Sequence, residues 1–177
     1  MLTPYHDRVL RAYLHAKDCG VPARFADAFT PDATFTSRFE FETSFSDEEP
    51  RVGLAAIAET FGLLTKHCDN ITTLCTLDSV VTDGDTLRNK WIVAMTNRDS
   101  GCIRVAWGDY VWTMDPEAER ARSLIVNMRH MAEMGPEHAE VVLVWLRALP
   151  APWCDGQALV VDMPALLGLV NLREYFV

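Results

Sequence analysis

The hydrophobic period of this chain changes at Ile71, and that change restricts the fold more than any other feature. From Ile71 onward apolar residues recur at every second position, the spacing of a strand with one buried face. Acidic, glycine and proline turn signals interrupt the alternation at Asp83-Gly84-Asp85, at Asp99-Ser100-Gly101 and at Pro116-Glu117. The pattern predicts four antiparallel strands, at roughly 71–82, 85–98, 102–115 and 122–133.

The residues before Ile71 follow helical spacing instead. Thr3-Pro4 has the form of an N-cap followed by proline at the first helical position, which predicts a helix running up to Gly20. Further predicted elements are a short helix from Pro22, a strand near 33–37, a strand or hairpin through Phe39, Phe41 and Phe45, and a helix over 53–67. This order predicts an α+β domain with helices packed on the concave face of a curved antiparallel sheet.

Composition excludes several classes of partner. The 177 residues suit one domain, and their net charge of −9 would repel a nucleic acid or an anionic membrane unless the few basic residues clustered. The five cysteines form no Cys-x-x-Cys pair and the five histidines are scattered, so neither a disulfide framework nor a metal site is predicted. No secretion signal, membrane span or glycine-rich phosphate loop is recognisable. We therefore expect a cytoplasmic protein without a cofactor.

Four short segments carry a resemblance to a known family. They are Ala12-Tyr13-Leu14, Asp18-Cys19-Gly20, Phe29-Thr30-Pro31-Asp32-Ala33-Thr34-Phe35 and Gly53-Leu54-Ala55-Ala56-Ile57. With the order of elements, they resemble the SnoaL-like branch of the nuclear-transport-factor-like superfamily, over about residues 4–133. The resemblance implies a cone-shaped α+β barrel that hosts isomerases, dehydratases and plain binding modules. It also implies a small apolar ligand of a polyketide, steroid or aromatic kind.

The resemblance implies that Tyr13 lies where ketosteroid isomerase keeps its oxyanion-hole tyrosine. A phenol can donate a hydrogen bond to a developing enolate, although a tyrosine packed in the core would look the same in sequence. Asp109 interrupts an apolar row that also holds Ile103 and Trp107. We expect this carboxylate to face the pocket. The alternative is that the other row, with Arg104, Tyr110 and Trp112, faces inward and Asp109 joins a salt bridge on a dimer face.

The general base of the isomerase aligns with Ser37 or Arg38, neither of which can abstract a proton, so ketosteroid isomerisation is not predicted. Glu40 or Glu42 could substitute only if the neighbouring phenylalanines faced away from the pocket. The resemblance also implies a second arrangement, a dyad of Asp18 and His67 like that of scytalone dehydratase. In such a pair the carboxylate fixes the tautomer of the imidazole and raises its basicity. His67 could instead simply stabilise the end of its helix, with Asp18 in solvent.

The predicted pocket is lined by Phe61, Trp91, Trp107 and His130, and the last could equally be a hydrogen-bonded core histidine. Two function classes follow. The first is an acid–base enzyme without a cofactor, a dehydratase-type lyase or an isomerase. The second is a non-catalytic module for binding a small ligand or for dimerisation.

Residues 136–177 lie beyond the resemblance and are strongly apolar. We expect a domain of residues 1–135 followed by this helical extension, with a final helix opened by Asp162 and Pro164. The extension would cap the cone of its own chain or swap across a dimer. Tyr110 and Trp112, on the opposite face of their strand from Asp109, also predict a homodimer through the outer sheet face.

Overall fold

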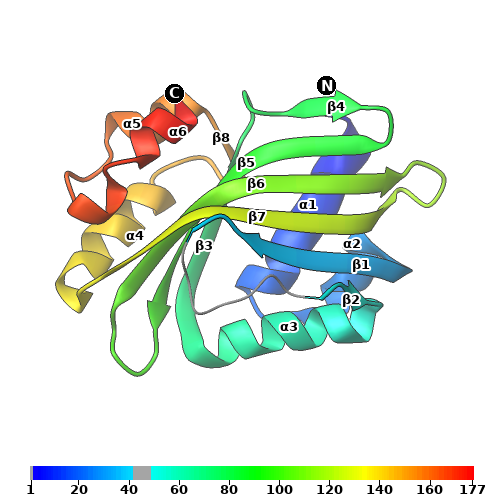
Figure 1. Cartoon of the computed structure of the whole chain (residues 1–177), viewed down its shortest axis with the longest axis horizontal. Coiled ribbons are helices and arrows are strands. Elements are labelled where there is room, and N and C mark those ends of the chain that lie inside the picture. The colour runs from blue at the N-terminus through cyan, green and yellow to red at the C-terminus, as the bar shows by residue number, and fades with distance from the viewer. Residues whose placement is uncertain (1, 42–48) are drawn as a thin grey trace.

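A computed structural model describes residues 2–41 and 49–177 of the chain. Its centre is one strongly curved, open sheet in the order β2-β1-β7-β6-β5-β3-β8, with β4 paired to β5 (Figure 1). The strands are β1 (Phe29–Phe39), β2 (Arg51–Val52), β3 (Cys68–Thr76), β4 (Val81–Asp83), β5 (Thr86–Asn97), β6 (Ile103–Asp115), β7 (Arg120–Met134) and β8 (Trp153–Cys154).

The antiparallel meander predicted from Ile71 onward is confirmed, because β3, β5, β6 and β7 pair antiparallel in that spatial order. Its first strand is shorter than expected, since β3 ends at Thr76 and a turn leads to β4. Two pairings are parallel instead, that of β1 with β7 and that of β3 with β8. Each joins strands far apart in the sequence, as a parallel pair requires. The hairpin residues Glu42 and Phe45 lie outside the described residues.

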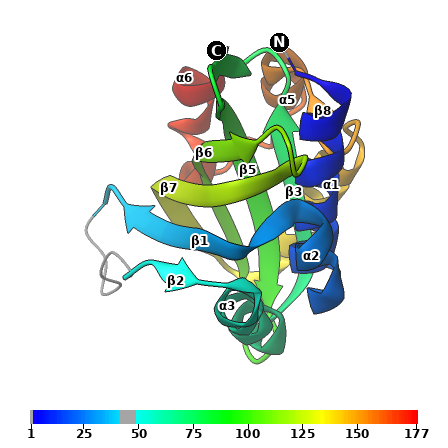
Figure 2. The ribbon, with the colours of Figure 1, turned by 90° about the vertical axis from the view of Figure 1, so that its right-hand side faces the viewer.

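Three helical segments cover the concave face, as Figure 2 shows. They are α1 (Pro4–Asp18), the 3-10 helix η1 (Pro22–Arg24) with α2 (Phe25–Ala28), and α3 (Leu54–His67). The predicted start of α1 is confirmed: the Thr3 hydroxyl accepts a hydrogen bond from the backbone N–H of His6, and Pro4 follows as the first helical residue. The α+β cone expected from the sequence is therefore confirmed.

The C-terminal residues cover part of the opposite face of the same chain's sheet (Figure 1). They form η2 (Pro136–His138), α4 (Ala139–Arg147), β8, α5 (Gly156–Val161), η3 (Leu167–Leu169) and α6 (Leu172–Phe176). Their apolar side chains pack on Leu74, Ile92, Val105 and Trp107 of the sheet. No described helix is long and apolar enough to cross a membrane.

The predicted final helix opened by Asp162 and Pro164 is wrong. Asp155 caps α5 instead, accepting hydrogen bonds from the backbone N–H groups of two following residues, and Asp162 lies at the C-terminal end of that helix. Further along, a Cβ at Gly168 would lie 2.9 Å from the Met134 sulfur of β7. The chain therefore approaches the sheet in a short 3-10 turn rather than in a regular helix.

Candidate functional site

Tyr13 lies at the centre of the concave core and is 1% exposed. Its ring contacts five other aromatic rings at centroid distances of 5.2–6.4 Å. These rings belong to Phe25, Phe29, Phe61, Tyr110 and Trp112. Four of the five contacts are close to perpendicular, the edge-to-face arrangement that aromatic pairs favour. Packed rings therefore surround Tyr13 on several sides.

The hydroxyl groups of Tyr13 and Tyr110 share a hydrogen bond. Burial raises the pKa of both phenols well above 10, so both stay protonated at neutral pH. The pair can therefore donate a hydrogen bond but cannot accept a proton as a base.

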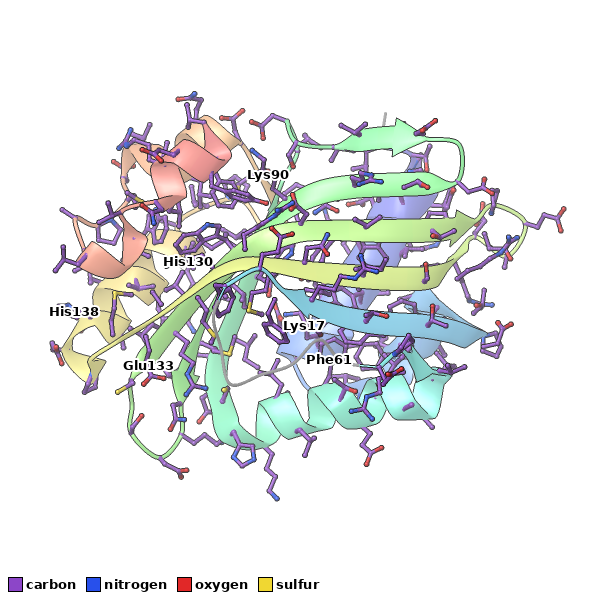
Figure 3. All side chains as sticks on the ribbon, viewed as in Figure 1. Lys17, Phe61, Lys90, His130, Glu133 and His138 are labelled. Carbon is purple, nitrogen blue, oxygen red and sulfur yellow. The ribbon has the colours of Figure 1, made fainter. Side chains whose placement is uncertain are left out.

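A small apolar hollow opens beside this aromatic cluster, where the end of α1 faces α2 and α3. Its volume is about 150 Å³. We call it the apolar hollow; it is lined by Ala16, Gly20, Pro22, Phe25, Ala58, Phe61, Gly62 and Thr65. Phe25 and Phe61 stack on each other at 5.3 Å, and both also contact Tyr13. In Figure 3, Phe61 lies between α3 and the sheet. The two phenylalanines thus connect the hollow to the phenol pair.

The sequence prediction found Phe61 but missed the other residues of the hollow. A signal was present, because small residues stand four positions apart, Ala16 of α1 with Gly20 just beyond its end and Ala58 with Gly62 within α3. Such spacing places small side chains on one face of a helix. Gly20 also needs its backbone freedom, with φ at +65° directly after the end of α1.

Trp91 is buried beside the phenols, as the sequence predicted for an inward-facing residue. Its ring stacks on Tyr110 at 5.2 Å with an interplanar angle of 17°. The indole N–H of Trp91 has no hydrogen-bond partner among the described residues. Trp107 lies on the opposite face of the sheet, packed against the C-terminal extension. The centroid of its ring lies 4.5 Å from that of the half-buried His130 ring. Trp107 and His130 therefore do not join Tyr13.

The predicted Asp18–His67 dyad is not formed. Asp18 accepts hydrogen bonds from the backbone N–H of Thr73 at 3.0 Å and from its hydroxyl at 3.0 Å, and it also pairs with the buried ammonium of Lys17. His67 is exposed at the end of α3, and within the described ranges no hydrogen bond or ion pair links it to Asp18. The carboxylate ties α1 to β3 and is not available to orient an imidazole.

Asp109 faces away from the concave core, which corrects the placement we expected. It shares a face with Ile103 and Trp107, as the alternation predicted, but that face is the one covered by the C-terminal extension. Asp109 accepts hydrogen bonds from Arg129 Nε at 2.8 Å and from the Tyr175 hydroxyl at 2.8 Å. The alternative is observed in part: the Tyr110 row faces inward, and Asp109 forms its salt bridge with Arg129 of the same chain.

Glu40 is not a substitute base beside the phenols. Glu40 is exposed and pairs with Arg129, and Glu42 lies outside the described residues. Within residues 2–41 and 49–177, no carboxylate or imidazole makes a hydrogen bond to Tyr13 or Tyr110. The same ranges contain no group of three or more histidine, cysteine, aspartate or glutamate side chains that could hold a metal ion.

Comparisons with known proteins define the fold. No family model matches the chain, and no curated protein matches its sequence. A solved structure from Catenulispora acidiphila, with a ketosteroid isomerase-like fold and bound trimethylamine, is 12% identical with a TM-score of 0.55, covering 86% of this chain and 98% of that one. An LEH-like epoxide hydrolase from M. tuberculosis is 13% identical with a TM-score of 0.50, covering 68% and 80%. An NTF2-like protein from Exiguobacterium is 16% identical with a TM-score of 0.51, covering 66% and 94%.

The chain therefore has the nuclear-transport-factor-like fold, and the resemblance seen in its sequence is confirmed at that level. Identities this low establish a shared architecture and leave the activity to the site itself.

Proposed function

We propose that this chain is a non-catalytic module that binds a compact, single-ring apolar molecule in the apolar hollow. The observation that carries the proposal is the hollow itself, which adjoins the aromatic core and has Thr65 as its one polar side chain. A cavity of about 150 Å³ lined by apolar groups can hold a benzene-sized molecule. Larger ligand sites span about 300–1,000 Å³, so a steroid or polyketide would not fit without displacing the aromatic rings.

The positions of the titratable groups favour binding over catalysis. An acid–base enzyme needs a group that can accept a proton within about 3 Å of its substrate. Asp18 is held by Thr73 and Lys17, His67 faces solvent, and Asp109 lies on the other side of the sheet. The phenols that remain are donors only. The dehydratase or isomerase interpretation thus lacks its base.

A reducing cytoplasm is part of the proposal. Its support is that all five cysteines are free thiols, three of them buried.

Toluene is a suitable probe, because it is apolar and close in size to the hollow. At ten times its Kd a ligand that binds only the folded state stabilises it by about 1.4 kcal/mol, which raises Tm by about 3–5 °C. We expect this shift in the native chain and its loss in Ala58→Leu, where the larger side chain fills the hollow. The matched control is Ala55→Leu, which places the same side chain on an exposed position of α3 and should keep the shift.

Two results would contradict the proposal. An equal toluene shift in Ala58→Leu and Ala55→Leu would show that the ligand binds elsewhere. Turnover of a hydroxy-ketone or enone that disappears in Tyr13→Phe would show that the core is catalytic.

A further inference from the structure

A second and larger hollow also lies along α1, and most of its lining residues are charged. We call it the arginine groove; its volume is about 650 Å³ and it is lined by Asp7, Arg8, Arg11, Ala12, His15, Arg24, Asp27, Ala118, Glu119 and Arg120. It holds four of the chain's 16 basic residues but only three of its 25 acidic ones. In a chain of net charge −9, this hollow is a local excess of positive charge.

The basic side chains come from three separate walls of the groove. Arg8, Arg11 and His15 stand on the exposed face of α1, at the three- and four-residue spacing of a helix. Arg24 belongs to η1, and Arg120 begins β7 after the β6–β7 turn. A molecule in the groove would therefore meet guanidinium groups from more than one direction.

The three carboxylates are already neutralised by three of the arginines. Arg8 pairs with Glu119, Arg11 Nε lies 2.9 Å from Asp7, and Arg24 lies 2.9 Å from Asp27. The Asp7 carboxylate also accepts a hydrogen bond from the Trp153 indole at 2.7 Å.

The exposed side chains of Arg120 and His15 have no hydrogen-bond or ion-pair partner in the described part of the chain. The paired arginines also retain donors, because a guanidinium has five N–H groups and a carboxylate engages two at most. The unused donors of the groove thus exceed its acceptors.

We propose that the arginine groove binds a small polyanion, carrying phosphate or carboxylate groups, with Arg120 of β7 and Arg24 of η1 as its main ligands. Planar guanidinium groups recognise both kinds of anion by paired hydrogen bonds. The volume lies within the usual range for small-molecule sites. This site is separate from the apolar hollow and does not depend on the function proposed for it.

The test is calorimetric titration of the full chain with inorganic pyrophosphate and, separately, with citrate. We expect saturable binding of one anion per chain, weakened about 10-fold or more in Arg120→Gln and in Arg24→Gln, because each loses a hydrogen bond to a charged group. Stronger binding of one probe would identify phosphate or carboxylate as the preferred group. The matched control is Arg88→Gln on β5, which removes the same charge from an exposed arginine outside the groove.

Three outcomes would overturn the proposal. These are no saturable binding of either anion, an equal loss in Arg88→Gln, and undiminished binding in both groove variants. Thermal unfolding of each variant separates loss of the site from loss of the fold, since substitution of exposed Arg120 or Arg88 should leave Tm nearly unchanged.

Discussion

The phenols of Tyr13 and Tyr110 make the stability of the folded chain depend on pH in the alkaline range. Burial raises the pKa of both in the folded chain, whereas an unfolded tyrosine ionises near pH 10. Above about pH 10 the folded state therefore holds more protons than the unfolded state, and the free energy of unfolding falls as pH rises. Below about pH 10 the protonated phenols make their full contribution to the stability of the folded state.

We predict that the double variant Tyr13→Phe, Tyr110→Phe loses part of this alkaline slope, measured by urea unfolding at pH 8 and pH 10.5. Tyr5→Phe is the control and should change the slope less, because Tyr5 is half exposed and burial raises its pKa less. A double variant with the same slope as the native chain would mean that the phenols ionise without unfolding the core.

Single residues also show where sequence reasoning ends. The burial of Tyr13 follows from its helical stripe, and the row of Asp109 follows from strand alternation. Alternation cannot say which face of a strand is the inside of the cone when both faces are covered by apolar residues. The tail covers one face here, so Asp109 meets Tyr175 rather than Tyr13. Predicting whether Asp18 and His67 form a dyad required the distance between two elements, and residue spacing along the sequence does not give that distance.

Among the elements, the β6–β7 pair leaves no room for a side chain at its register shift. The register shifts between Trp107 and Gly108, and a Cβ at Gly108 would lie 1.8 Å from the Asn127 carbonyl oxygen. We predict that Gly108→Ala lowers the free energy of unfolding by about 3 kcal/mol or more, because backbone atoms cannot move aside as a flexible side chain can.

Gly62→Ala on α3 is the matched control for Gly108→Ala. A Cβ there meets nothing within 4 Å, and alanine favours a helix over glycine by about 1 kcal/mol. Chemical denaturation of the two variants should give changes of opposite sign. Equal stability of Gly108→Ala and the native chain would show that the register shift is not rigid.

The elements themselves were the most predictable part of the molecule. Long periodic segments such as α1, α3 and the meander gave clear sequence signals, and their order was enough to predict helices packed on a curved sheet, whereas the cone shape came from the family resemblance. The parallel pairing of β1 with β7 and the short pieces of the tail were missed, because tertiary contacts such as that of Gly168 with Met134 decide them.

At the scale of the whole molecule, the tail completes the fold. Residues 136–177 cover a buried cluster that includes Trp107, Val105 and Ile92, and Tyr175 and Lys90 fasten α6 to the sheet. We predict that a chain of residues 1–135 is insoluble or lacks cooperative unfolding, since this apolar face would be open to water. A soluble, monodisperse and cooperatively unfolding fragment, measured by light scattering and calorimetry, would contradict this.

The homodimer predicted from the sequence stays a prediction, but the residues that would form its interface are not those that suggested it. The large apolar residues that suggested it are covered by the chain's own tail or, for Tyr110 and Trp112, point into the core. A dimer through the outer face would have to use the remaining surface around Val111 and Ile125, which are half-buried. Sedimentation equilibrium tests the dimer, because a dimer has twice the mass of the 19.9 kDa monomer. A measured mass equal to that of the monomer would exclude the dimer.

The central claim, that the apolar hollow is the binding site, is tested most directly by nuclear magnetic resonance of alanine methyl groups during a toluene titration. Ala16 and Ala58 line the hollow, whereas Ala55 is exposed on the same helix as Ala58. We predict saturable shifts of the Ala16 and Ala58 signals at one common Kd, with the Ala55 signal unchanged. Signals of Ala16 and Ala58 that do not respond, or that shift no more than Ala55 and without saturation, would contradict it.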